Sequence, residues 1–297
     1  MELRVLRYFL AAVREESISK AAESLHLTQP TLSRQIMELE EELGIKLLNR
    51  GKKNRKVTLT DEGKLFRKRA EELVELADKM RSEFSVTEGP VSGEIYIGSG
   101  ETEAMRLIAA AATELQKEYP HIRYHLFSGN ATDVTERLDN GLLDFGILVG
   151  EADMTKYDYL PLSVTDVWGV LMRKDSPLAE KNAVSQKDLS QIPLILSQQS
   201  LSSNELSGWY GGTFGESNVV ATYNLIYNAA LMVASGFGYA VTLDKLVNTT
   251  GNSDLCFRPL APRLEARLSI VWKKHRGFSK ATELFLQKLR CLIHPDD

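Results

Sequence analysis

The chain has 297 residues, of which 43% are hydrophobic and 26% are charged. This composition is typical of a globular protein, no apolar run is long enough to span a membrane, and the length favours two or three domains over a single core. The net charge of −4 is unevenly spread: residues 1–60 carry 11 Lys and Arg against 8 Asp and Glu, so the acidic whole does not exclude binding to nucleic acid.

Two short amphipathic helices are predicted at the start of the chain. Apolar residues recur at helical spacing in the first, at Leu3, Leu6, Phe9, Leu10 and Val13. The second has small residues, Ala21 and Ala22, on its inner face, which would let another helix approach closely. We expect Ser17 or Ser19 to cap its first turn by accepting a backbone N–H bond.

A third helix follows, with Thr28 as a suitable N-cap, Pro30 in the first turn and Gly44 at the end. One face is apolar and is expected to pack in the core, through Leu32, Ile36, Leu39 and Leu43. The opposite face carries Gln29, Pro30, Ser33, Arg34 and Met37. Arginine can bond guanine, glutamine can bond adenine, and serine can bond a base or a phosphate, so this face is typical of a helix that reads DNA.

Residues 45–60 are predicted to form two short strands joined by a basic turn, an arrangement known as a wing. Five cations fall between Arg50 and Lys56, and they could pair with phosphates or enter a minor groove. The alternative is a solvated charged loop, but the position directly after a reading helix favours the nucleic-acid interpretation. We therefore predict contacts with double-stranded DNA through Ser17, Thr28, Gln29, Pro30, Thr31, Ser33, Arg34, Arg50, Lys52, Lys53 and Arg55.

This part of the chain resembles the N-terminal signature of LysR-type transcriptional regulators. The resemblance lies in residues 6–9, 17–25, 27–33, 36–39, 41–44, 47–50 and 59–63. It implies a winged helix-turn-helix domain, a long dimerising linker helix and a two-lobed effector domain similar to periplasmic binding proteins. The expected fold class is therefore α/β with a helix-rich N-terminal domain. The expected boundaries are 1–59, 60–90 and 91–297, with one lobe formed by 91–162 and 267–297 and the other by 163–266.

A long helix is predicted from residue 60 onward. Apolar residues recur every three or four positions along it, at Phe66, Ala70, Leu73, Ala77, Met80 and Phe84. A narrow apolar seam on a charged helix favours a partner helix, and packing on its own domain is the alternative. We predict that Phe66, Leu73, Met80 and Phe84 form a dimerisation surface, whether the assembly is a dimer or a tetramer. The segment 87–90 then breaks the helix.

Beyond this break the pattern alternates between strands and helices, which favours a parallel sheet. Strands are predicted at 94–98, 122–127, 144–149, 167–172, 194–196, 218–222, 239–243 and 268–272. Helices are predicted at 103–118, 131–140 and 280–293. The resemblance implies that the chain crosses between two lobes near Leu162 and returns near Arg267.

Ligands of open α/β sheets bind beyond the carboxyl ends of the strands, and hydroxyls with free N–H groups at a helix start form an anion site. The loops that the family uses map onto Ser99, Gly100, Thr102, Ser128, Asn130, Ser197, Gln198 and Phe237. For each of them a role as a helix cap or turn residue is the alternative. Glu101 departs from the family pattern, because it puts a negative charge where an anionic effector would bind. If Glu101 points into the cleft we expect an amine or amide ligand, and if it caps its helix an anion remains allowed.

Catalysis, metal binding and a cofactor are not expected. His121 and His125 fall on a predicted strand and would stand too far apart for a metal pair, and no known catalytic spacing occurs. Charged residues interrupt the N-terminus and only two cysteines are present, so we expect a cytoplasmic protein with no membrane association. The expected partners are DNA, a small-molecule effector, a second copy of the chain and RNA polymerase. A solute-binding protein and a ligand-independent regulator are the alternatives.

Overall fold

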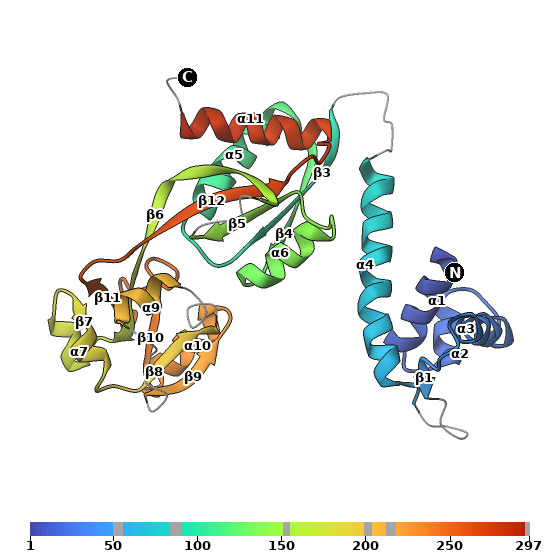
Figure 1. Cartoon of the computed structure of the whole chain (residues 1–297), viewed down its shortest axis with the longest axis horizontal. Helices are drawn as coiled ribbons and strands as arrows, with labels where there is room; N and C mark the ends of the chain where they lie inside the picture. The colour runs from blue at the N-terminus through green and yellow to red at the C-terminus, as the bar shows by residue number, and fades with distance from the viewer. Residues whose placement is uncertain (50–55, 84–90, 151–154, 199–203, 212–217, 295–297) are drawn as a thin grey trace. The chain divides into compact units, whose positions relative to one another are not determined.

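The computed structural model describes residues 1–49, 56–83, 91–150, 155–198, 204–211 and 218–294 (Figure 1). The chain divides into two compact units, Met1–Ser85 and Val86–Asp297. Among the described residues, no helix combines the length and the apolar character that crossing a membrane requires.

The first unit confirms the predicted order of helices and strands. It contains α1 (Leu3–Arg14), α2 (Ile18–Ser24), α3 (Gln29–Leu43), β1 (Leu48–Asn49), β2 (Thr58–Leu59) and α4 (Asp61–Glu83). Its core joins the apolar faces of the helices, and Phe9, Leu32, Ile36 and Leu47 are fully buried there. Helix α3 therefore has one fixed face and one free face, as the spacing of its leucines and isoleucine predicts.

The turn between α2 and α3 is set by local hydrogen bonds. Ser17 caps α2, because its side chain accepts from the backbone N–H of Lys20. At the other end His26 has a positive φ of 55°, and Leu27 N donates to Ala22 O over 2.8 Å. This closes the helix in the pattern of a Schellman motif and satisfies carbonyls that the helix end would otherwise leave unpaired.

The wing strands β1 and β2 pair antiparallel, with Leu48 opposite Leu59. Helix α4 begins directly afterwards, and Thr60 caps it by accepting from Gly63 N over 2.9 Å. A Cβ placed on Gly63 would lie 2.1 Å from the carbonyl oxygen of Leu47, so only glycine permits this close approach. The start of α4 thus packs directly against Leu47, the residue before β1. The turn between the strands lies outside the described residues.

The predicted seam on α4 divides into two neighbouring faces. Phe66 packs edge-on against Phe9 at 5.1 Å between ring centroids, and Ala70 is buried in the same core. Phe66 is half-buried and packs against the core of its own unit, so its part in dimerisation stays a prediction. The exposed apolar residues of the helix are Leu65, Leu73, Leu76 and Met80, and we call them the α4 stripe. Phe84 lies outside the described residues.

The second unit is a mixed α/β structure. Its strands are β3 (Ser92–Ser99), β4 (His121–Ser128), β5 (Phe145–Val149), β6 (Tyr157–Arg173), β7 (Val184–Ser185), β8 (Leu194–Ser197), β9 (Val219–Tyr223), β10 (Tyr239–Leu243), β11 (Leu255–Ala261) and β12 (Glu265–Lys273). Its helices are α5 (Met105–Glu118), α6 (Ala131–Asp139), the 3-10 helix η1 (Pro177–Glu180), α7 (Gln186–Leu189), α9 (Asn204–Tyr210), α10 (Ile226–Ala234) and α11 (Lys280–Ile293).

The strands follow the order β4-β3-β5-β12-β6-β10-β8-β9, and β11 pairs with β6 and β7. As predicted, β3 runs parallel to β4 and β5, and β8 runs parallel to β9 and β10. Two differences appear: β6 is far longer than the predicted strand at 167–172, and β7 and β11 were not predicted. The extra length exists because β6 pairs with β12 at one end and with β10 and β11 at the other.

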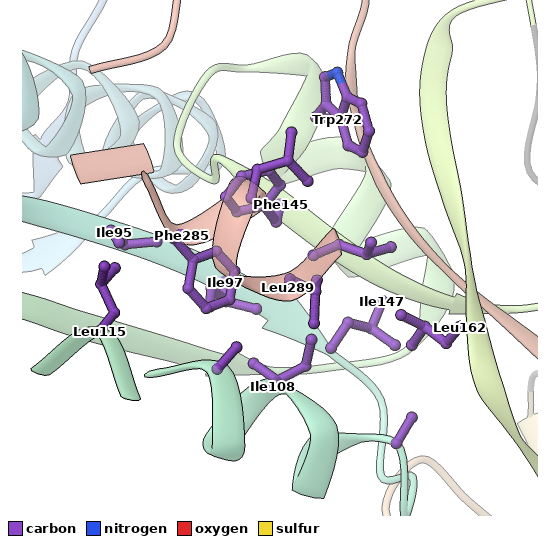
Figure 2. Close-up of a cluster of buried hydrophobic side chains, with 14 of the residues drawn as sticks. Ile95, Ile97, Ile108, Leu115, Phe145, Ile147, Leu162, Trp272, Phe285 and Leu289 are labelled. Carbon is purple, nitrogen blue, oxygen red and sulfur yellow. The ribbon is translucent and has the colours of Figure 1, made fainter. Parts of the chain in front are cut away.

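Two groups of elements lie along β6 and β12, and each has its own core (Figure 1). In the first lobe, formed by β3–β5 with α5, α6 and α11, Ile95 and Ile97 of β3 pack against α5 and α11. Figure 2 shows these side chains together with Phe145 and Phe285. In the second lobe, formed by β7–β11 with α7, α9 and α10, the strands β8 and β10 are buried on both faces. The carboxyl ends of the parallel strands position the candidate ligand residues.

Candidate nucleic-acid interface and ligand site

The free face of α3 presents polar side chains from a well-capped start. Thr28 Oγ1 accepts from Thr31 N over 3.4 Å, and the two hydroxyls lie 2.8 Å apart. Thr28 and Thr31 thus shape the helix start and remain exposed, as do Gln29 and Pro30. Ser33 is half-buried on the same face.

Arg34 is a highly accessible charged group of this helix. Its side chain is 81% exposed, and its Nε donates to Glu38 Oε1 over 2.8 Å. An exposed pair at this i,i+4 spacing stabilises a helix by only about 0.3–0.5 kcal/mol. The guanidinium can therefore exchange Glu38 for a base edge or a phosphate at little cost.

Glu40 is a structural carboxylate that our reading of the sequence did not single out. It is 2% exposed, and its Oε1 accepts from Leu47 N over 2.8 Å and from Leu48 N over 3.0 Å. Lys46 Nζ lies 3.2 Å from the other oxygen. Glu40 thus joins the end of α3 to the base of the wing. Its position four residues after Ile36 and three before Leu43 places it on the buried face, which was the available signal.

Replacing Glu40 by alanine should lower the free energy of unfolding of the first unit by about 2–4 kcal/mol, because two buried N–H groups would lose a charged acceptor. Chemical denaturation of the full-length chain measures this. Glu41→Ala is the matched control, since Glu41 is exposed on the same helix turn. Equal unfolding midpoints for the two variants would contradict the assigned role.

Of the basic run, Lys56 is described, whereas Arg50, Lys52, Lys53 and Arg55 lie outside the described residues. Lys56 is exposed and pairs with the Glu16 carboxylate, and that hydrogen bond raises the pKa of Lys56. Val57 N also donates to Glu16 O over 2.9 Å, which fixes the second wing strand to the turn between α1 and α2.

The predicted ligand residues of the first lobe lie together at the ends of β3 and β4. Ser99 stands opposite Ser128 in the strand register, and Gly129 N donates to Ser99 O over 3.0 Å. Gly100 follows Ser99 and is half-buried, and Ser128 is exposed. Asn130 caps α6 in a capping box with Asp133, so the alternative role as a helix cap holds for it.

The hydroxyls of Ser99 and Thr102 are buried and engaged within the chain. Ser99 Oγ donates to Gly100 O over 2.7 Å, and Thr102 Oγ1 donates to Asp166 Oδ2 over 2.6 Å. Asp166 lies on β6, is 1% exposed, and its Oδ1 has no hydrogen-bond partner among the described residues. Burial raises the pKa of Asp166, and the hydrogen bond from Thr102 partly offsets this increase. A ligand would meet these hydroxyls only after displacing the existing bonds.

In the second lobe the structure separates Phe237 from the other predicted residues. Ser197 ends β8 and pairs in register with Tyr223 of β9, and the exposed Gln198 follows it. Phe237 lies just beyond the last turn of α10 and just before β10. It therefore stands at the amino end of a parallel strand, the edge opposite Ser197, so the structure does not bring it together with the other predicted residues of this lobe.

Glu101 reaches from the first lobe to the second. Its Oε2 accepts a hydrogen bond from the backbone N–H of Ile226, the first residue of α10. Glu101 thus caps a helix of the other lobe, whereas the sequence offered only its own helix or a free position. Burial raises the pKa of Glu101, and the bond from Ile226 opposes that effect.

Among the described residues, no group of three or more His, Cys, Asp or Glu is placed to hold a metal ion. His121 and His125 lie on β4, and the ring of His125 stacks on Tyr96 with the ring centroids 4.5 Å apart. The candidate sites are thus a polar helix face and a junction between two lobes.

Two family models match the chain. The model described as "Bacterial regulatory helix-turn-helix protein, lysR family" matches residues 3–64, and the model described as "LysR substrate binding domain" matches residues 88–292. Together they cover most of both compact units.

Curated relatives are similar over much or all of the length. The uncharacterized HTH-type transcriptional regulator YvbU of Bacillus subtilis (strain 168) is 27% identical over 296 residues, covering 99% of each chain. The HTH-type transcriptional regulator BsdA of the same organism is 31% identical over 201 residues, covering 66% of this chain and 67% of BsdA. These relatives are regulators rather than enzymes.

A solved structure has the same fold. Full-length CbnR, crystallised in complex with its target DNA, matches with a TM-score of 0.75 and 20% identity, covering 98% of this chain and 100% of CbnR.

Proposed function

This chain belongs to the LysR family of DNA-binding transcriptional regulators, and from that premise we propose that the free face of α3 reads its operator while a small molecule bound between the lobes changes the DNA-bound state. One observation carries the DNA part. The buried residues of α3 fix its orientation, and the helix then exposes Gln29, Pro30 and Arg34 together. Side chains held on a rigid helix are suited to reading base edges in a major groove.

The proposal includes the cations of the wing turn, Arg50, Lys52, Lys53 and Arg55, as phosphate contacts. A phosphate contact adds affinity for every sequence and makes that affinity fall as salt rises. We further propose RNA polymerase as a partner and the cytoplasm as the location, since a regulator of chromosomal genes acts where the DNA is.

The ligand part is supported by the way the lobes are joined. Ser99, Gly100 and Ser128 lie at the strand ends of one lobe, and Ser197 and Gln198 lie at those of the other. A molecule that contacts both groups can favour one arrangement of the lobes over another, which is what coupling between two sites requires. We propose the domain limits 1–59, 60–90 and 91–297 as the units that carry these roles.

Selection of duplexes from a random-sequence pool by the full-length protein tests this function. We expect enrichment of a sequence with two half-sites about one helical turn apart or a multiple of it. Titration of that duplex in the presence of a metabolite library should then reveal a compound that changes affinity by about 5–150-fold. A pool without enrichment would contradict DNA reading, and enrichment without any responsive compound would favour a ligand-independent regulator.

A further inference from the structure

The hydrogen bond between Glu101 and Ile226 joins the two lobes. Glu101 stands between β3 and α5, directly after the strand-end residues Ser99 and Gly100. Ile226 begins α10 in the other lobe. The bond therefore links the two sets of loops between which the effector is proposed to bind.

The start of α10 lacks a side-chain cap from its own N-cap residue. The N-cap position is Leu225, which makes no side-chain capping bond, and the first turn holds no acidic residue. The first N–H groups of a helix point away from its body and carry partial positive charge, so they favour an anion. The Glu101 carboxylate supplies that anion from a distance of 125 positions in the sequence.

The Glu101 carboxylate is partly removed from water, and this desolvation disfavours its charged form. Glu101 is half-buried, and burial raises its pKa. Burial raises the pKa of Tyr223, and the charge of Glu101 adds to that effect; the Tyr223 hydroxyl donates to Val241 O over 2.7 Å. A desolvated carboxylate is stabilised in such a place by a hydrogen-bond donor, and the backbone N–H of Ile226 at the helix end provides one.

We propose that Glu101 determines the ligand specificity of this site: its carboxylate fills the anion-binding end of α10, so that the effector is neutral or cationic at this point. The inference rests on the proposed function, because it takes the junction between the lobes as the ligand site. It also holds that the α10 end accepts a free carboxylate once the Glu101 side chain is removed. Glu101 thus acts as a tethered ligand that joins the lobes before any effector binds.

Amide hydrogen exchange of the full-length protein, read by mass spectrometry, tests this with acetate as the probe. In Glu101→Ala, peptides covering the start of α10 should exchange about tenfold faster than in the wild type. Acetate should slow that exchange toward the wild-type rate when compared with chloride at the same ionic strength. The wild type should not respond to acetate, because its own carboxylate occupies the helix end.

Glu114→Ala is the matched control, since it removes an exposed carboxylate that pairs with Lys117 on α5. It should leave exchange at α10 unchanged. If Glu101→Ala unfolds the domain, exchange will also rise throughout α5, and Glu101→Gln then replaces it. The glutamine variant keeps an oxygen acceptor but loses the charge, so faster exchange confined to the start of α10 is expected, and wild-type exchange would overturn the role of the charge.

Two results would overturn the proposal directly. Unchanged exchange at α10 in Glu101→Ala would show that Glu101 does not hold the helix end. Equal responses of the variant and the wild type to acetate, including no response in either, would show that no anion subsite is opened. Because the measurement uses neither DNA nor effector, its failure is distinct from a failure of the proposed regulatory function.

Discussion

Arg34→Ala should weaken binding to the selected duplex by about 1–3 kcal/mol and relax discrimination at one base pair. The reason is the position of the guanidinium, which is 81% exposed on the free face of α3 and pairs with Glu38 at the surface. Competition titrations against duplexes that carry each of the four base pairs at every position measure both effects.

Arg67→Ala is a closely matched control for this substitution. Arg67 Nε donates to Glu71 Oε1 over 2.8 Å at the same i,i+4 spacing, but on α4. Both variants lose one exposed ion pair and one positive charge, so a general electrostatic or helix-stability effect would appear equally in the two. If Arg34→Ala binds the duplex as tightly and as selectively as Arg67→Ala, α3 is not the reading helix.

Leu73→Glu should convert the assembled protein to monomer. Leu73 is 45% exposed and Met80 is 54% exposed, and with Leu65 and Leu76 they lie within about a quarter turn of the helix surface. Exposed apolar residues gathered on an otherwise charged helix favour a covering partner. Loss of one leucine from each subunit of a symmetric interface should cost roughly 2–4 kcal/mol before any burial of charge is counted. Light scattering and sedimentation over a range of concentrations measure the assembly.

The Leu73→Glu substitution should weaken binding to a duplex with two half-sites far more than binding to a single half-site. In a dimer, binding of one DNA-binding domain raises the effective concentration of the second domain at the neighbouring half-site. Arg67→Glu is the control, since residue 67 lies at least about 120° around the helix from every residue of the α4 stripe. A monomeric wild type at micromolar concentration, or equal assembly of Leu73→Glu and Arg67→Glu, would refute the α4 stripe as the interface.

The elements defined by local signals were predicted well. Thr28 and Gly44 do begin and end α3, and the leucine spacing correctly assigned its buried face. Short apolar runs between turns also located β3, which ends at Ser99, and β8, which ends at Ser197. Caps, helical spacing and strand alternation act over a few residues, so a single sequence contains them.

The features that the sequence did not show depend on partners distant in the chain. The sequence does not show that α1 packs on Phe66, and the loops carried over from the family do not show that Phe237 stands at the strand edge opposite Ser197. The length of β6 reflects pairing with strands on both sides. The bond from Ile226 to Glu101 joins residues 125 positions apart, so no local pattern could indicate it.

A genome-wide map of DNA occupancy in cells that express the full-length protein tests the central claim most directly. The account predicts discrete occupied sites that share one sequence, the loss of those sites in Arg34→Ala and their retention in Arg67→Ala. Uniform occupancy in the wild type, or the same discrete sites in Arg34→Ala, would contradict a regulator that reads its operators with α3.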